Sequence, residues 1–358
     1  MGLRFWIGAA GACVALCALD RTGLAAGDVA AAPPLAHIGA PDRAISYVFK
    51  YVPQEMSLGA HPWNSQIAEA WIYARLFDEP GKQYVLMRTV RDLKSNGVTL
   101  TTDGKPDPRI PREAGDITRT VDPSAGLVFS GREFHVALSP DAVAWTDQAG
   151  AVSLQGSRSP LGQVGTAELI PYQQQDGSTG IDIYTGQYYP VIGTLLGTAV
   201  KGMFVVDHFI GTELFGGSAL SSNEVVWFKF ANVFADGSVE MGEMFTEQAA
   251  PHGAGPVAPM HGGSVTDGTR VIATSPDPRV SFVLNAQREA SKETWTIGKD
   301  QWEFVPDSTG VKALGKSGLV QAWGGVHRVG DRRKIVNQFA ITEYNVSRFT
   351  PDMVKGSR

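Results

Sequence analysis

Short runs in which apolar and polar residues alternate, separated by turns containing glycine or proline, recur along most of this chain. The clearest lies at 225–241, where an alternating segment leads through Asp236-Gly237 into a second one. An Asp-Gly pair favours a tight hairpin because both residues tolerate the positive φ angles that such a turn needs. The first half of the chain shows no long amphipathic helical period. Regular short strands with frequent turns predict an all-β sandwich or barrel.

Other turn signals set the remaining predicted hairpins. Pro80-Gly81 separates two alternating runs, so we expect antiparallel strands on either side, although residues 65–76 could also form a short helix. Ser95-Asn96-Gly97 predicts a further hairpin, and Gly330-Asp331 predicts the last one.

Length and composition favour a folded protein of two domains that does not bind nucleic acid. Of its 358 residues, 43% are hydrophobic and 19% are charged, which suffices for about two cores. The net charge is −5, and lysines and arginines are dispersed among acids. Nucleic-acid binding needs concentrated positive charge to displace counterions from phosphates, so this class of partner is excluded.

The N-terminus has the pattern of a secretory signal. Arg4 precedes an apolar run, Phe5–Leu19, that is too short to span a bilayer comfortably. We therefore expect a signal peptide at 1–26 and a secreted or periplasmic mature protein with no integral membrane segment; an uncleaved N-terminal anchor is the alternative. Cys13 and Cys17 both lie in the run, so the mature chain would contain no cysteine, which excludes disulfides and thiol catalysis.

Common catalytic and cofactor motifs do not occur in the sequence. It contains no G-x-S-x-G, no P-loop and no dinucleotide fingerprint. The seven histidines are scattered without metal-ligand spacing, and His252 with His261 is the pair that could still meet in space. We predict neither a cofactor nor a metal site.

Three segments together resemble one known family. The first is Glu69–Tyr73 with Asp78–Lys82, and the third is Trp323–Val326 with Ile341–Tyr344. The second contains Asp207-His208, Gly211, Trp227, Asp236-Gly237 and Glu240-Met241. In this order and spacing they are similar to the family of AttH-like proteins and carotenoid 1,2-hydratases (hydroxyneurosporene synthases), which has two lipocalin-like barrels in tandem. The resemblance implies two antiparallel calycin-type barrels and a hydrophobic small molecule, lipid- or terpenoid-like, as the ligand.

The domain boundaries follow from the pattern and from this resemblance together. We expect a linker at 27–41, an N-terminal barrel at 42–217, a C-terminal barrel at 218–349 and a polar tail at 350–358. The segment from Gly202 to Met244 would then join the two barrels.

Asp207 and His208 are the candidate catalytic residues at this joint. If one strand continues through both, their side chains point to opposite faces, so they cannot act as a pair. In an apolar pocket, either could serve as a general acid that protonates an alkene or a carbonyl. The structural interpretation is that Asp207 caps the glycine-rich turn near Gly211.

The candidate ligand-binding residues are tryptophans and glutamates on the predicted strands: Trp71, Trp227, Trp323, Glu69 and Glu240. Flat aromatic side chains suit an apolar ligand, and core packing is the alternative for each of them. Glutamates on the strands, including Glu243, are expected to face solvent; one that faced inward would be a candidate acid or base.

Three functions remain open at this point. The first is cofactor-independent acid/base chemistry, of the hydratase or isomerase kind, in which a hydrophobic molecule is hydrated, isomerised or cyclised. The second is a carrier that binds such a molecule without turnover. The third is a carbohydrate-active β-sandwich, which would need two carboxylates across a cleft.

Overall fold

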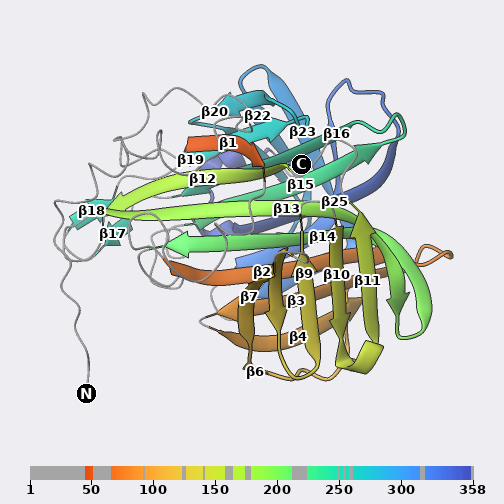
Figure 1. Cartoon of the computed structure of the whole chain (residues 1–358). Coiled ribbons are helices and arrows are strands. Elements are labelled where there is room, and N and C mark those ends of the chain that lie inside the picture. The colour runs from red at the N-terminus through yellow and green to blue at the C-terminus, as the bar shows by residue number, and fades with distance from the viewer. Residues whose placement is uncertain are drawn as a thin grey trace.

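The structure is a computed structural model, and the residues that it describes are 45–50, 66–91, 93–122, 126–139, 142–157, 164–173, 179–211, 224–247, 250–252, 255–257, 261–314 and 319–355. Nearly all of them lie in antiparallel strands, which form two large curled sheets and one short separate hairpin (Figure 1). This arrangement is consistent with two tandem barrels, so the predicted all-β, lipocalin-like class is confirmed. The signal peptide and linker expected at 1–41 lie outside the described residues.

The first sheet has fourteen strands, which are β1 (Ile45–Lys50), β2 (Gln66–Phe77), β3 (Gln83–Arg91), β4 (Lys94–Thr102), β5 (Lys105–Asp107), β6 (Gly115–Asp116), β7 (Thr118–Asp122), β8 (Gly126–Ser130), β9 (Phe134–Leu138), β10 (Ala142–Asp147), β11 (Val152–Ser157), β12 (Val164–Gln173), β13 (Thr179–Leu195) and β14 (Thr198–Gly211). Their order runs β5-β4-β3-β2-β14-β13-β11-β10-β9-β8-β7. β6 precedes β7 directly and pairs with β4, so the two ends of this path meet and the sheet closes on itself. The long strand β13 also pairs with β12, which carries β1 toward the other sheet (Figure 1).

The second sheet has nine strands, which are β15 (Glu224–Phe234), β16 (Val239–Glu247), β19 (His261–Thr266), β20 (Val271–Ser275), β21 (Arg279–Leu284), β22 (Ala290–Ile297), β23 (Asp300–Leu314), β24 (Leu319–Arg328) and β25 (Ile335–Asn345). Their order is β20-β19-β16-β15-β25-β24-β23-β22-β21. β17 (Ala250–His252) and β18 (Gly255–Val257) form the separate hairpin, and the 3-10 turns are η4 (Gln148–Gly150), η6 (Val346–Arg348) and η7 (Pro351–Met353). The boundary predicted at 217 falls within 212–223, outside the described residues.

Three of the predicted hairpin turns are confirmed, at β2–β3, β15–β16 and β24–β25. Gly81, Gly237 and Gly330 occupy these turns with φ angles of 88°, 82° and 85°, which only glycine adopts without strain. The alternative of a short helix at 65–76 is wrong, since 66–77 form β2.

The hairpin predicted at Ser95-Asn96-Gly97 is also wrong. These residues lie inside β4, and the chain reverses before them, where Leu93 has a φ angle of 60°. Gly97 has a φ of 78°, and a Cβ there would lie 2.8 Å from the backbone of Glu113. The glycine therefore permits a close approach of two backbone segments rather than a turn.

Buried apolar residues form three clusters. One consists of residues of the first sheet and one of residues of the second, with Trp145 and Trp295 among their largest buried side chains. The third lies between the two sheets and contains Tyr73, Val85, Tyr188, Met203, Val205, Ala231, Val239, Met241, Trp323, Phe339 and Ile341. We call this third cluster the junction, because it joins residues of both sheets.

One end of the junction is fastened by hydrogen bonds between the barrels. Arg75 on β2 donates from Nη1 to the Gly324 carbonyl and from Nη2 to Asp307 Oδ2, each over 2.6 Å. Asn337 on β25 donates from Nδ2 to the Gly202 carbonyl of β14 over 2.8 Å. The two barrels are therefore held in register by polar contacts as well as by apolar packing.

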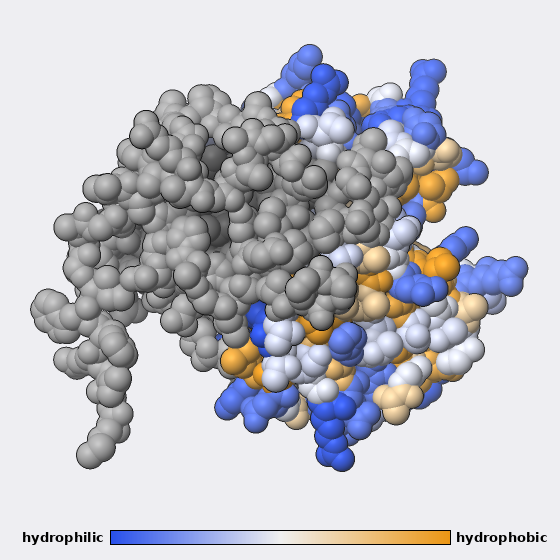
Figure 2. Space-filling view, in the orientation of Figure 1, coloured by the Kyte–Doolittle hydropathy of each residue, from blue (hydrophilic) through white to orange (hydrophobic). Residues whose placement is uncertain are grey.

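The described part of the outer surface is mostly hydrophilic on the face shown in Figure 2, with apolar colour confined to small, separate areas. The large apolar side chains that remain exposed in the described ranges are Leu93, Ile192, Val283, Val305, Val329 and Val336. Single exposed residues of this kind are ordinary on a protein surface, so they do not mark a binding site.

Candidate functional site

The side chains of β14 alternate between the first barrel and the junction. Phe204 and Val206 belong to the core of the barrel, whereas Met203 and Val205 belong to the junction. Asp207 accordingly faces the junction and His208 faces the barrel interior, where its ring stacks on that of Phe129. The prediction that the two residues point apart is therefore confirmed.

Asp207 meets a buried lysine of the other sheet. Lys229 on β15 places its Nζ 2.5 Å from Asp207 Oδ1 and 3.4 Å from Glu243 Oε2, and none of the three side chains is exposed. Glu243 also accepts a hydrogen bond of 2.7 Å from the Trp227 indole N–H. The lysine therefore bridges acids from β14 and β16 across the junction, and we call these three residues the junction triad.

A glycine makes room for the triad. Gly186 on β13 lies beside Asp207 in the sheet, and a Cβ at this position would sit 2.2 Å from Lys229 Nζ and 3.0 Å from Asp207 Oδ1. A larger residue at 186 would displace the ammonium group or the carboxylate. The absence of a side chain here is part of the geometry of the site.

The charges of the triad stabilise one another in a dry environment. Burial on its own would lower the pKa of Lys229, but Asp207 and Glu243 together raise it above its ordinary value, so the ammonium form is favoured. For the adjacent Tyr188 hydroxyl, which is neutral when protonated, burial raises the pKa. With one cation and two anions, the triad carries a formal charge of −1.

A fourth ionisable group, Glu343, lies beside the triad on β25, opposite Trp227. Burial raises the pKa of its carboxyl, and the charge of Asp207 raises it further. Gln321 on β24 donates from Nε2 to Glu343 Oε1 over 2.6 Å and in turn accepts from the Trp323 indole N–H over 3.3 Å. Glu343 is less buried than the three residues of the junction triad, which are fully buried.

The three predicted tryptophans gather at the junction. Trp323 is a member of the apolar cluster, and the half-buried Trp71 and Trp227 pack against it. Trp71 lies opposite Asp207 in the pairing of β2 with β14. The structure thus brings Asp207 together with all three tryptophans.

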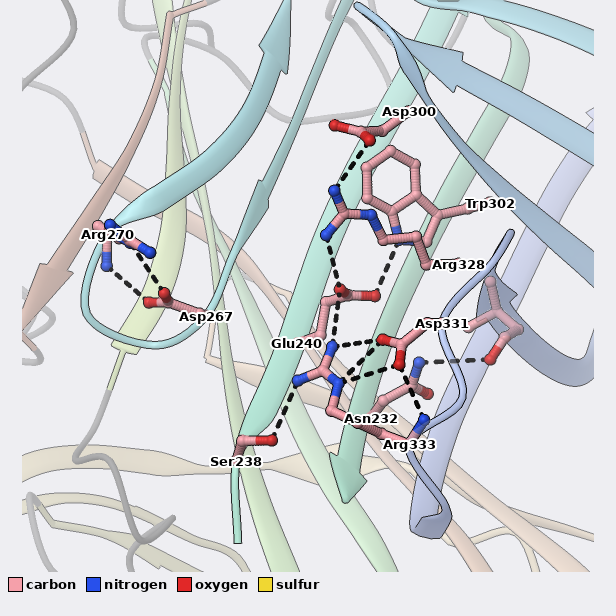
Figure 3. A network of polar contacts seen from close by, with 11 residues as sticks. Asn232, Ser238, Glu240, Asp267, Arg270, Asp300, Trp302, Arg328, Asp331 and Arg333 are labelled. Atoms are coloured by element: carbon pink, nitrogen blue, oxygen red, sulfur yellow. Dashed lines mark hydrogen bonds and ion pairs between the residues drawn. The ribbon is translucent and has the colours of Figure 1, made fainter. Parts of the chain in front are cut away.

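The predicted Glu240 occupies a different place, at the other end of β16. It is buried, and its Oε1 accepts from the Trp302 indole N–H over 2.9 Å (Figure 3). Arg333 approaches its Oε2 within 3.4 Å and Arg328 within 4.0 Å. Burial raises the pKa of Glu240, while these partners oppose that shift.

The first barrel contains a similar network. Asp147 on β10 accepts from Nε and Nη2 of Arg88, at 2.9 and 2.8 Å, and from the Trp145 indole N–H at 3.1 Å. In each barrel, a buried carboxylate is thus bound by an arginine and a tryptophan. Glu240 and Asp147 therefore fasten distant strands of their own barrels, and Glu240 is not part of the junction.

Glu69 lies on β2, where its backbone pairs with Phe209 of β14 and Arg91 of β3; its side chain is outside the part that the structure describes. The side chains of His252 and His261 are outside that part as well. Within the described ranges, no group of three or more histidine, cysteine, aspartate or glutamate side chains is arranged to hold a metal ion. In the same ranges, no helix has the length and apolar character to cross a bilayer.

Sequence reasoning missed Lys229, Gln321 and Glu343, and it expected Glu243 and Glu240 to face solvent, which is wrong. The strand pattern around Lys229 reads Val-Trp-Phe-Lys-Phe, in which the lysine alternates with buried phenylalanines and so looks outward. Side chains that point outward from the second barrel on this strand, however, point into the junction between the two sheets. The aromatic residue on the same face, Trp227, was the available signal that this face is covered.

Comparisons with known proteins find similarity in fold only. No family model matches the chain, and no curated protein matches it. A solved structure described as AttH, from Nitrosomonas europaea, is 14% identical with a TM-score of 0.40 and covers 83% of this chain and 96% of its own. Kievitone hydratase from Nectria haematococca is 9% identical with a TM-score of 0.38 over 82% and 92%. A third, CghA, is 8% identical with a TM-score of 0.38 over 77% and 87%.

An AttH protein and a hydratase are thus among the structures whose fold this chain is similar to. At this level of similarity, the activity of these proteins is not transferred to this chain. What the fold and the site define by themselves is an all-β protein with two curled sheets and a buried charged triad between them.

Proposed function

We propose that this protein binds a hydrophobic small molecule at the junction and catalyses cofactor-independent acid/base chemistry on it, as hydration, isomerisation or cyclisation. The observation that carries the proposal is the placement of Glu343, a half-buried acid with a raised pKa, beside the buried triad of Lys229, Asp207 and Glu243. Perturbed ionisable groups of this kind concentrate at functional sites.

In this proposal Glu343 is the proton donor. Gln321 donates to its Oε1, which leaves the acid proton on Oε2. Transfer of that proton to an alkene carbon creates a cation, and the π faces of Trp71 and Trp227 together with the net negative triad stabilise it. In a hydration, water adds to the cation and its surplus proton returns to the Glu343 carboxylate. In an isomerisation, the cation instead loses a neighbouring proton to the same group.

The experiment incubates the purified protein with a lipophilic extract of its native host in deuterated, ¹⁸O-enriched water and follows the products by mass spectrometry. Hydration adds one solvent oxygen and one carbon-bound deuterium, whereas isomerisation adds only the deuterium. We expect Glu343→Gln to lower the rate by about 10²-fold or more, as loss of a general acid does. The matched control is Glu113→Gln, which alters an exposed glutamate of the first barrel. Full turnover in Glu343→Gln would remove Glu343 from this role.

The second candidate is a carrier that binds the same class of molecule without turnover. The gathering of Trp71, Trp227 and Trp323 at an apolar junction supports it equally well. Quenching of tryptophan fluorescence by an extract component that is recovered without isotope would identify a carrier. The carbohydrate-active alternative would be favoured by one continuous sandwich, whereas the described strands form two large separate sheets.

We also propose that the protein is exported, and this part of the proposal rests on the N-terminal sequence alone. The predicted signal at 1–26 supports secretion or transfer to a periplasm. N-terminal sequencing of the protein from its native host would show whether the mature chain begins close to residue 27.

A further inference from the structure

An arginine of the first barrel is buried with two guanidinium nitrogens that have no acceptor among the described residues. Arg119 lies on β7, opposite Phe129 on β8, and only 8% of it is exposed. Its Nε and Nη1 atoms are buried and have no hydrogen-bond partner among the described residues. The guanidinium carbon lies 5.0 Å from the centre of the Phe129 ring, over its face.

A second nitrogen-bearing side chain reaches the same ring. His208 on β14 stacks on Phe129 with ring centres 6.0 Å apart and planes inclined by 17°. β14 and β8 are not neighbours in the sheet, so this contact crosses the interior of the barrel. Arg119, Phe129 and His208 therefore bring two groups that can carry positive charge to one place inside an apolar barrel.

Another buried arginine, Arg88, does have hydrogen-bond acceptors. In the same barrel, Arg88 donates from Nε and Nη2 to Asp147 and from Nη1 to Ser95. Arg119 lacks such partners, and burial lowers its pKa to about 10. Burying guanidinium N–H groups without acceptors is costly, so the arrangement is incomplete unless an anion supplies the acceptors.

We propose that Arg119 is the anion-binding residue of a second ligand site, inside the first barrel, which takes the carboxylate of an amphiphile with an apolar chain. A carboxylate offers oxygens in a plane that matches the guanidinium. The surrounding cluster is apolar and includes Leu127 and Val136, so its chemistry favours a ligand with an apolar chain over a small hydrated anion, which would lose its water there.

This site is separate from the junction. Asp207 and His208 are neighbours on β14 but face opposite sides of the sheet, so a ligand beside His208 does not touch the triad. The two proposals can therefore fail independently.

Decanoate is the test ligand, with decan-1-ol and methyl decanoate as uncharged analogues, and binding is measured by isothermal titration calorimetry. In the wild-type protein we expect decanoate to bind at least tenfold more tightly than either analogue. Arg119→Met should lose at least tenfold in decanoate affinity and keep the affinity for decan-1-ol. Arg132→Met, which changes an exposed arginine of the same barrel, and Asp207→Asn should each change decanoate affinity by less than twofold.

Equal binding of decanoate and decan-1-ol by the wild type, or no binding of decanoate, would overturn the proposal without any variant. Unchanged decanoate affinity in a folded Arg119→Met protein would overturn it too, and would leave Arg119 as a stacking partner of Phe129. If circular dichroism shows that Arg119→Met does not fold, Arg119→Lys replaces it. It keeps the charge but not the planar fork, and a loss of decanoate affinity of at least threefold is expected.

Discussion

At the scale of single residues, the face on which a side chain emerges decides its chemistry. Asp207 and His208 are adjacent in sequence, yet one contacts Lys229 at the junction and the other stacks on Phe129 in the first barrel. A residue pair that looks catalytic in the sequence is thereby divided between two sites. Substitutions at the two positions should have different consequences.

We expect Asp207→Asn to lower turnover by about tenfold or more and His208→Ala to leave turnover within about threefold. The asparagine removes the negative charge that helps to raise the pKa of Glu343, so the acid loses its proton at lower pH. In a pH–rate profile, the limb that falls with rising pH should therefore move to lower pH. His208→Ala should instead lower the free energy of unfolding by roughly 1 to 3 kcal/mol through lost packing. Equal losses of turnover in both variants would contradict the division into two sites.

Glu293 provides a second test at this scale, because it is buried in the core of the second barrel. Its Oε1 accepts from the Trp295 indole N–H, its Oε2 has no partner among the described residues, and burial raises its pKa to about 8 from an ordinary 4.5. Between these two values the unfolded chain has lost the proton that the folded chain keeps. Stability therefore falls as pH rises from 4.5 to 8, with a slope of about 1.4 kcal/mol per pH unit from this group.

Glu293→Gln should remove this slope. Urea denaturation at pH 5, 6, 7 and 8 should show the variant gaining stability relative to the wild type as pH rises. Glu289→Gln, at a partly exposed position just before the same strand, is the control and should follow the wild-type curve. Parallel curves for wild type and Glu293→Gln would show that this carboxyl is ionised in the folded protein.

At the scale of elements, the pairing of β13 with β14 positions the junction triad. Gly186 faces Asp207 in this pairing and leaves the space that Lys229 Nζ occupies. We expect Gly186→Ala to displace the ammonium group, lowering both turnover and the free energy of unfolding, the latter by roughly 2 to 4 kcal/mol because the methyl group overpacks a charged cluster.

Gly115→Ala is the matched control for this substitution. It places a methyl group in open space at an ordinary backbone angle, so it should leave both quantities unchanged. Turnover and urea denaturation of the two variants check the prediction, and equal effects of both would show that Gly186 is not special.

Hairpins were the part of the fold that local sequence could predict, because Pro80-Gly81, Asp236-Gly237 and Gly330-Asp331 each carry their own turn chemistry. Ser95-Asn96-Gly97 was misread, since a positive φ at Gly97 serves a contact with Glu113, which is distant in sequence. The triad could not be predicted for the same reason. The packing of the two barrels decides whether the outer face of β15 contacts water or the other sheet. The alternation of residues within 224–234 does not reveal this packing.

At the scale of the whole molecule, the barrels are joined by a junction that is apolar in its middle and polar at two places. Arg75 donates to Gly324 and Asp307 at one place, and the triad lies at the other. Both places join residues of the first sheet to residues of the second. The geometry of the triad therefore depends on an interface that other contacts hold in place.

Arg75→Met separates these two contributions, because it removes the hydrogen bonds of Arg75 without substituting any residue of the triad. The Gly324 carbonyl loses this donor and Asp307 loses one of two, since Gln83 also donates to it, so we expect unfolding to cost roughly 2 to 4 kcal/mol less and turnover to fall as the triad loses its register. Scanning calorimetry should show a lower Tm than that of the wild type, with broader or divided unfolding as the barrels uncouple. Arg109→Met removes the ion pair that the exposed Arg109 makes with Asp107 within the first barrel, and it should change stability by less than about 1 kcal/mol. If Arg75→Met and Arg109→Met behave alike, apolar packing alone holds the junction, and the geometry of Asp207 and Lys229 is independent of the fastening at Arg75.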